Sequence, residues 1–85
     1  MLGKKLVTKG AMRQGKLLGF HHAEQERILS GEALRDFARS ESFAFIYSSR
    51  LFSRWASALR SIYEQAFIET YTAMVERSRA LKNAQ

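Results

Sequence analysis

The chain of 85 residues contains no cysteine and no proline, and it has no long apolar run. Without cysteine, both disulfides and thiolate metal sites are excluded, which is typical of a reducing compartment. The longest uncharged stretch runs from Ser42 to Ser49, far short of the ~20 apolar residues that span a bilayer. We therefore expect a protein without a transmembrane segment, located in the cytoplasm or within a nucleoprotein particle.

The start of the chain also lacks the features of a targeting signal. Lys9, Arg13 and Lys16 interrupt the apolar stretch that a secretory signal needs, and no small-residue cleavage motif follows. Mitochondrial presequences are rich in Arg and Ser, whereas residues 1–22 hold one Arg and no Ser. We expect a protein that is not secreted.

Acidic residues are absent from residues 1–22, and this absence concentrates the net charge there. Five cations give this segment a charge of +5, whereas residues 23–85 carry nine Lys or Arg against eight Asp or Glu, a charge of +1. Such asymmetry is typical of a basic segment that binds a polyanion. The candidate polyanion-binding residues are Lys4, Lys5, Lys9, Arg13 and Lys16.

Glycine is scarce except in this same segment, where four of the five glycines precede Phe20. Each glycine costs a helix interior ~1 kcal/mol relative to alanine, and Lys9 and Arg13 fall among the leucines on a helical wheel. We therefore predict an extended, flexible basic arm over residues 1–20. Because helices that lie on membranes need one strongly apolar side, nucleic acid is the favoured polyanion, and an anionic membrane surface is the alternative.

The remaining residues, 21–85, read as a single helical domain or docking unit. Helix-forming residues predict a short helix or helical hairpin over residues 21–39, with a turn at Ser30 and Gly31. From Ser42 to Lys82, apolar residues recur with the helical spacing and neither glycine nor proline intervenes. The fold class is therefore all-α, with one long amphipathic helix over residues 42–82.

The length of this predicted helix has a consequence for assembly. Forty-one residues would extend ~60 Å, whereas a compact domain of this size has a radius of gyration of ~12 Å. Either the helix breaks near Ser48 and Ser49, giving a three-helix bundle, or it stays whole and packs on a second copy or a larger assembly. We favour the second arrangement. Its partner interface would comprise Leu51, Phe52, Trp55, Leu59, Ile62, Tyr63, Phe67, Tyr71 and Met74.

Aromatic and arginine side chains alternate between Phe43 and Trp55. Proteins that bind single strands stack bases on such rings. Most of the rings, however, fall on the apolar stripe of the helix and the arginines on its polar face, so a core or a protein interface explains them better.

No pattern in the sequence indicates catalysis, a cofactor or a metal. His21, His22 and Glu26 could supply ligands, but a zinc site needs three or four and no second histidine cluster exists. The glycines do not match a phosphate-binding loop. We expect no catalytic residue, no metal, no cofactor and no small-molecule substrate.

These features together predict a non-enzymatic, small helical assembly protein. It would dock through its aromatic helix and contact nucleic acid with its basic arm. One alternative is a peripheral membrane or membrane-complex subunit whose aromatic helix lies at the lipid boundary. Another is a structural helical dimer with an idle basic tail.

Overall fold

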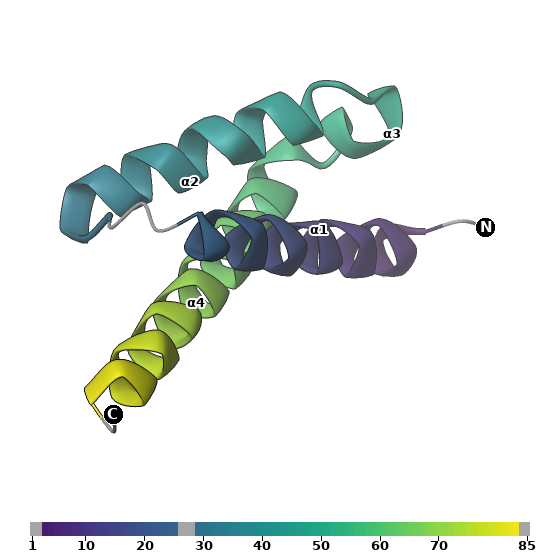
Figure 1. Ribbon diagram of the computed structural model, residues 1–85. Coiled ribbons are helices and arrows are strands. Elements are labelled where there is room, and N and C mark those ends of the chain that lie inside the picture. The colour runs from purple at the N-terminus through teal and green to yellow at the C-terminus, as the bar shows by residue number, and fades with distance from the viewer. Residues whose placement is uncertain (1–2, 26–28, 84–85) are drawn as a thin grey trace.

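The computed structural model describes residues 3–25 and 29–83, which form helices and no strand (Figure 1). The helices are α1 (Lys4–Glu24), α2 (Gly31–Ile46), α3 (Arg50–Ser53) and α4 (Ala56–Asn83). The molecule is elongated, with extents of 51 × 23 × 16 Å. The predicted all-α fold class is confirmed.

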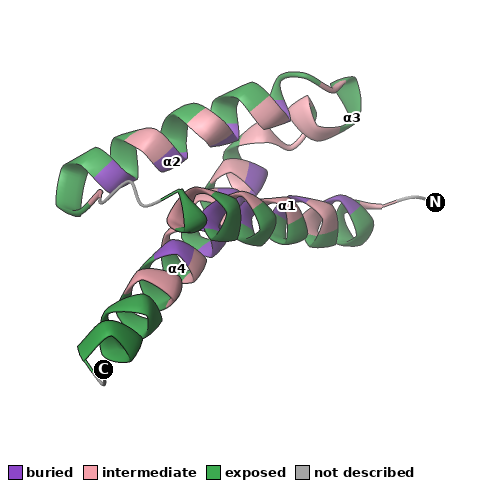
Figure 2. Cartoon of the chain, in the orientation of Figure 1, coloured by how far each residue is buried: buried purple, intermediate pink, exposed green. Residues whose placement is uncertain are grey.

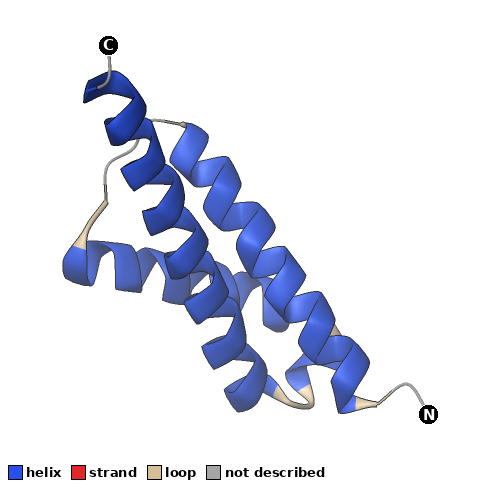
Figure 3. Cartoon of the chain, turned by 90° about the horizontal axis from the view of Figure 1, so that it is seen from below, coloured by secondary structure: helices blue, strands red, loops and turns tan. Residues whose placement is uncertain are grey.

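The helices are arranged around α4. Helix α1 lies beside α4 and runs in the same direction, because Gly15 lies against Tyr63 and Gly19 against Phe67. Helix α2 runs the opposite way along α4, and its Phe45 ring contacts the Tyr63 ring while residues nearer its start contact Phe67. Figures 1 and 3 show this order, with α3 and the start of α1 at the same end of the molecule.

The prediction of an extended arm over residues 1–20 is wrong for the described residues, because α1 begins at Lys4. The glycines that argued against a helix are where α1 packs. A Cβ added at Gly15 would lie 2.5 Å from the backbone oxygen of Tyr63, and one at Gly19 would lie 2.6 Å from that of Phe67. Tertiary packing against α4 therefore outweighs the low helix propensity of glycine.

The long helix predicted over residues 42–82 is divided, so the favoured unbroken arrangement is wrong. Ser42 belongs to α2, which ends at Ile46, and α4 begins at Ala56. At the break, the Ser48 hydroxyl donates to the Phe45 carbonyl oxygen at 2.6 Å, and the Ser49 hydroxyl oxygen accepts from the Leu51 N–H at 3.2 Å. Such side-chain bonds compete with the helical backbone bonds, and they coincide with the break that the alternative placed near these serines.

The core consists of three rows of buried residues, one from each long helix, and each row repeats every four residues (Figure 2). The rows are Val7, Ala11, Gly15 and Gly19 on α1; Leu34, Ala38, Ser42 and Ile46 on α2; and Leu59, Tyr63, Phe67 and Tyr71 on α4. Rows of this period are the ridges that interlock when helices pack. The largest side chains of the core come from α4, and the smallest come from α1.

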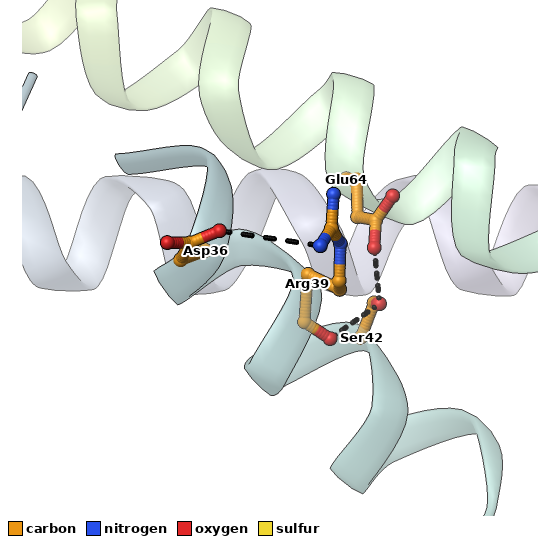
Figure 4. Close-up of polar contacts among 4 residues, drawn as sticks. All are labelled: Asp36, Arg39, Ser42 and Glu64. Carbon is orange, nitrogen blue, oxygen red and sulfur yellow. Dashed lines mark hydrogen bonds and ion pairs between the residues drawn. The ribbon is translucent and has the colours of Figure 1, made fainter. Parts of the chain in front are cut away.

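Ser42 is the polar member of these rows, and its hydroxyl is fully buried. The hydroxyl oxygen lies 2.9 Å from Glu64 Oε1 and 2.9 Å from the Arg39 carbonyl oxygen (Figure 4). A buried hydroxyl needs such partners to offset its loss of hydration. The contact with Glu64 joins α2 to α4.

Candidate polyanion-binding face of α1

Four of the five cations of α1 lie away from its buried row, and the fifth, Lys4, lies at the start of the helix. At ~100° per residue, Lys5, Lys9 and Lys16 fall within about 40° of one another, and Arg13 is adjacent to them. These four side chains and Lys4 at the start of the helix are all exposed. The structure therefore gathers the five predicted polyanion-binding residues on the exposed surface of one rigid element. We name this set of five the cationic face.

Nothing in α1 neutralises the cationic face. The helix has no acidic residue before Glu24, and none in its first turn. Among the described residues, no ion pair involves any of the five cations. Lysines at a helix N-terminus also oppose the helix dipole, and the cap residue Gly3 has no side chain to satisfy the first N–H groups. The charge pattern disfavours the helix itself and leaves a positive potential at this surface.

Four large apolar side chains share the exposed side of α1. Leu6 is 61% exposed and Leu17 59%, and Met12 and Phe20 are exposed with them. On a helical wheel Phe20 falls between Lys9 and Arg13, and Met12 falls beside Lys5. The exposed surface thus mixes cations with apolar side chains.

The residues predicted as a partner interface take part mainly in the core of the chain itself. Leu59, Tyr63, Phe67 and Tyr71 are buried, Phe52, Trp55, Ile62 and Met74 are partly buried, and Leu51 alone of the nine is exposed. The face that was expected to need a second chain is covered by α1 and α2. The length argument for an assembly therefore no longer holds, and association with a second chain stays a prediction.

One of the two histidines connects helices. His22 Nε2 lies 3.6 Å from Glu41 Oε1, and its ring meets the edge of Phe37 with centroids 4.7 Å apart. The candidate co-ligand Glu26 lies outside the described residues. Within residues 3–25 and 29–83, no group of three His, Asp or Glu side chains could hold a metal ion. His22 thus joins α1 to α2.

The aromatic residues before the break differ in burial, which the sequence does not indicate. Phe45 packs inward on Phe52 with ring centroids 4.9 Å apart, whereas Phe43 and Tyr47 lie on the surface. All three rings belong to the same short apolar stretch of the sequence, so the sequence alone does not tell which ring is buried. The structure does, because Phe45 is partly buried and Phe43 and Tyr47 are exposed.

Across the part of the chain that the structure describes, no helix is both long and apolar enough to cross a membrane. Comparison of the chain with protein-family models, with curated proteins and with solved structures gives no match.

Proposed function

We propose that this protein is a non-enzymatic, helical nucleic-acid-binding module that works as part of a larger assembly. Its cationic face would contact phosphates, and the compact core behind that face would hold α1 in place. One observation carries the proposal: five exposed cations lie on a single helix that has no acidic residue before Glu24.

The dimensions of the cationic face support contact with several phosphates at once. From Lys5 to Lys16 the helix rises ~16 Å, and duplex DNA carries one negative charge per ~1.7 Å of its axis. Lysine ammonium groups act as point charges, and their contacts with phosphates carry no sequence information directly. Binding through this face would therefore be independent of sequence and sensitive to salt.

The salt dependence of binding tests the proposal. With five phosphate contacts, the affinity for a labelled DNA or RNA should fall ~10²–10³-fold between 50 and 200 mM salt. Fluorescence anisotropy of the full chain measures this directly. An affinity that does not change with salt would remove the proposal.

A matched pair of charge variants locates the contact. The triple variant Lys5→Gln, Lys9→Gln and Lys16→Gln removes three charges from the cationic face. The control, Arg77→Gln, Arg79→Gln and Lys82→Gln, removes three exposed charges near the end of α4. Each lost phosphate contact should reduce the salt slope by about 1, so the first variant should lose about 3 and the control about none. Equal losses would mean that net charge, and not the cationic face, governs binding.

The exposed side chains of Leu6, Leu17 and Phe20 favour a second candidate, an anionic membrane surface. Helices that lie on membranes combine cations with apolar side chains that enter the lipid. Flotation with anionic and neutral liposomes separates the two candidates. Co-flotation with anionic liposomes that is lost in the variant Leu17→Ser and Phe20→Ser supports the membrane; protein that stays at the bottom with both kinds of liposome removes it.

A further inference from the structure

The surface of α2 carries a pair of stacked aromatic rings that the core does not use. Phe43 is 44% exposed and Tyr47 52% exposed. Their ring centroids lie 4.9 Å apart with the planes inclined by 28°. Their neighbour Phe45 turns inward and stacks on Tyr63. Packing within this chain therefore accounts for Phe45, whereas Phe43 and Tyr47 stay about half exposed and stack on each other.

One arginine lies over a ring of this pair, and two more follow the pair closely in the sequence. The Arg60 guanidinium lies 4.3 Å from the centre of the Phe43 ring, and the Arg54 guanidinium lies 5.4 Å from that of Trp55. Arg50 is exposed at the start of α3. Among the described residues, no ion pair involves any of these three arginines. The Arg60 Nε atom is buried without a hydrogen-bond partner, so the contact with the ring is the interaction that the structure gives this group.

The charge of this region has a single sign. Residues 43–63 contain three arginines and no Asp or Glu. The acidic residue that follows them, Glu64, accepts a hydrogen bond from Ser42. An anionic ligand would thus meet exposed rings and cations, and the nearby Glu64 carboxylate is engaged by the Ser42 hydroxyl.

We propose that Phe43 and Tyr47 stack the unpaired bases of a single-stranded nucleic acid whose phosphates contact Arg50 and Arg60. The inference rests on the proposed nucleic-acid function and narrows its ligand to a single strand. Aromatic rings stack any base, because every base has a π-face. The bases of a duplex are already stacked on one another, so this pair would distinguish single strands from duplexes.

The two cationic regions lie at the same end of the molecule. A Cβ added at Gly10 of α1 would be 3.6 Å from the Phe52 ring of α3, and Figures 1 and 3 place the start of α1 beside α3. Lys5 and Lys9 precede Gly10 on α1. Because Gly10 lies ~100–140° around α1 from Lys5 and Lys9, these lysines lie on a different side of α1 from the α3 contact. A strand bound to both regions would therefore pass around this end of the molecule.

Binding of a labelled oligo(dT) strand and of a duplex of equal length, both measured by anisotropy, tests the inference. In the variant Phe43→Leu and Tyr47→Leu, apolar side chains remain but the rings are lost. Stacking of a base on an aromatic ring raises affinity roughly 10-fold or more. This variant should therefore bind the single strand at least 10-fold more weakly than the native chain, whereas its affinity for the duplex should not change. Leu51→Ala, which removes an exposed apolar side chain of α3 without a ring, is the control and should bind both as the native chain does.

Fluorescence gives a second readout that does not depend on affinity. With Trp55→Phe and Tyr47→Trp together, the chain has a single tryptophan at the proposed stacking position. Oligo(dT) should quench its emission, whereas the duplex should not. Circular dichroism of each variant establishes that the helices persist.

The outcomes separate this inference from the proposed function. Binding that needs the cationic face but is the same with and without the two rings overturns the inference and leaves the function standing. Preference of the native chain for duplex, or tryptophan emission that stays unquenched in the complex of the Tyr47→Trp variant, also overturns it. Absence of binding to either nucleic acid removes both. Ring-dependent binding to anionic vesicles alone would assign the pair to a membrane and overturn the inference.

Discussion

Helices α1 and α4 pack along rows of buried residues with the same period, but the residues of the α4 row are large and those of the α1 row are small. On α4 the row presents large side chains, among them Tyr63 and Phe67, whereas the facing row of α1 ends in Gly15 and Gly19. The α4 backbone occupies the space that side chains on α1 would fill. Helix α4 therefore fills the core with its large side chains, and the small residues of α1 allow the two helix backbones to lie close together.

This difference explains why one helix is evident in the sequence and the other is not. Helix α4 contains neither glycine nor proline and carries a regular apolar face. Helix α1 has glycines at a cost of ~1 kcal/mol each, no side-chain cap and no acid in its first turn. Its helical state depends on α4, because short helices without tertiary contacts are marginal in water.

The largest effect should come from removing volume on α4. Phe67 is fully buried, and its ring lies 6.4 Å from those of Tyr63 and Tyr71 and 5.8 Å from that of Phe37. Phe67→Ala should lower the free energy of unfolding by ~3–5 kcal/mol through lost burial and the cavity that remains. Urea titration followed by circular dichroism measures this change.

The matched control for this variant is Phe20→Ala, which truncates the same residue type on the exposed side of α1. Surface substitutions usually change stability by no more than ~0.5 kcal/mol. Losses of similar size in the two variants would contradict the division of roles between the two helices.

Adding volume to α1 should have the next largest effect. In Gly15→Ala the new Cβ would lie 2.5 Å from the Tyr63 backbone oxygen and 3.1 Å from the Ala66 Cβ, so the helices must separate. The expected destabilisation is at the upper end of the ~1–3 kcal/mol typical of overpacking, and it exceeds the ~1 kcal/mol gained in helix propensity. Thermal and urea unfolding both measure it.

The same substitution at Gly10 should act in the opposite direction. There the added Cβ would make an ordinary contact at 3.6 Å with the Phe52 ring. Gly10→Ala should therefore stabilise the protein by ~0.5–1 kcal/mol through helix propensity alone. If both alanines stabilise the chain, the close approach of α1 to α4 is not required.

These opposite expectations show what a sequence can predict of this fold. The periodicity over residues 42–82 predicts helix from local information, and α4 (Ala56–Asn83) covers most of that range, but the periodicity does not show the break before it. The role of Gly15 is not local, because it depends on a carbonyl group 48 residues further along the chain. The glycines of α1 lower its intrinsic helix propensity, but Gly15 and Gly19 allow it to pack closely on α4, and the sequence alone does not show this contact.

The site divides in a similar way. Charge alone selected Lys5, Lys9, Arg13 and their neighbours, and the structure exposes all of them, although binding stays a prediction. The apolar face of α4 was also evident, but what covers it was not. If residues 1–20 form an extended arm, residues such as Tyr63 have no cover within the chain, and the sequence then predicts that a second chain covers them.

High pH should destabilise the protein through ionisation of Tyr63, a member of the α4 row. Burial, with a further contribution from the Glu41 carboxylate, raises the pKa of Tyr63 from 10.0 to about 12. The folded protein thus holds this proton more tightly than the unfolded chain. The contribution of Tyr63 to stability is therefore constant below about pH 10 and is lost as the pH rises toward 12. At ~1.4 kcal/mol per pKa unit, the loss at pH 12 is roughly 2 kcal/mol. Urea titrations at steps from pH 9 to 12 measure the slope.

Tyr63→Phe is the control for this pH dependence. It keeps the ring in the core and removes the ionisable hydroxyl, so its stability should decline less between pH 10 and 12 than that of the native chain. Parallel curves for the two would exclude Tyr63 as the group responsible.

The smallest destabilisation concerns α2, whose row is intermediate in size and includes the buried hydroxyl of Ser42. One hydroxyl hydrogen serves one acceptor at a time, so the bond to Glu64 competes with the bond to the Arg39 carbonyl oxygen, each at 2.9 Å (Figure 4). Ser42→Ala should cost ~1 kcal/mol, the usual net value of a hydrogen bond. Exposed Ser40→Ala is the control and should change little.

A double-mutant cycle decides which acceptor matters. If the bond to Glu64 holds α2 on α4, Glu64→Ala should destabilise the native chain more than it destabilises the Ser42→Ala variant, with a coupling of at least ~0.5 kcal/mol. Additive losses would mean that the hydroxyl bonds within its own helix, as serines in helices commonly do. The packing of α2 would then resemble that of α1, set by the size of the side chains in the row and not by a polar contact.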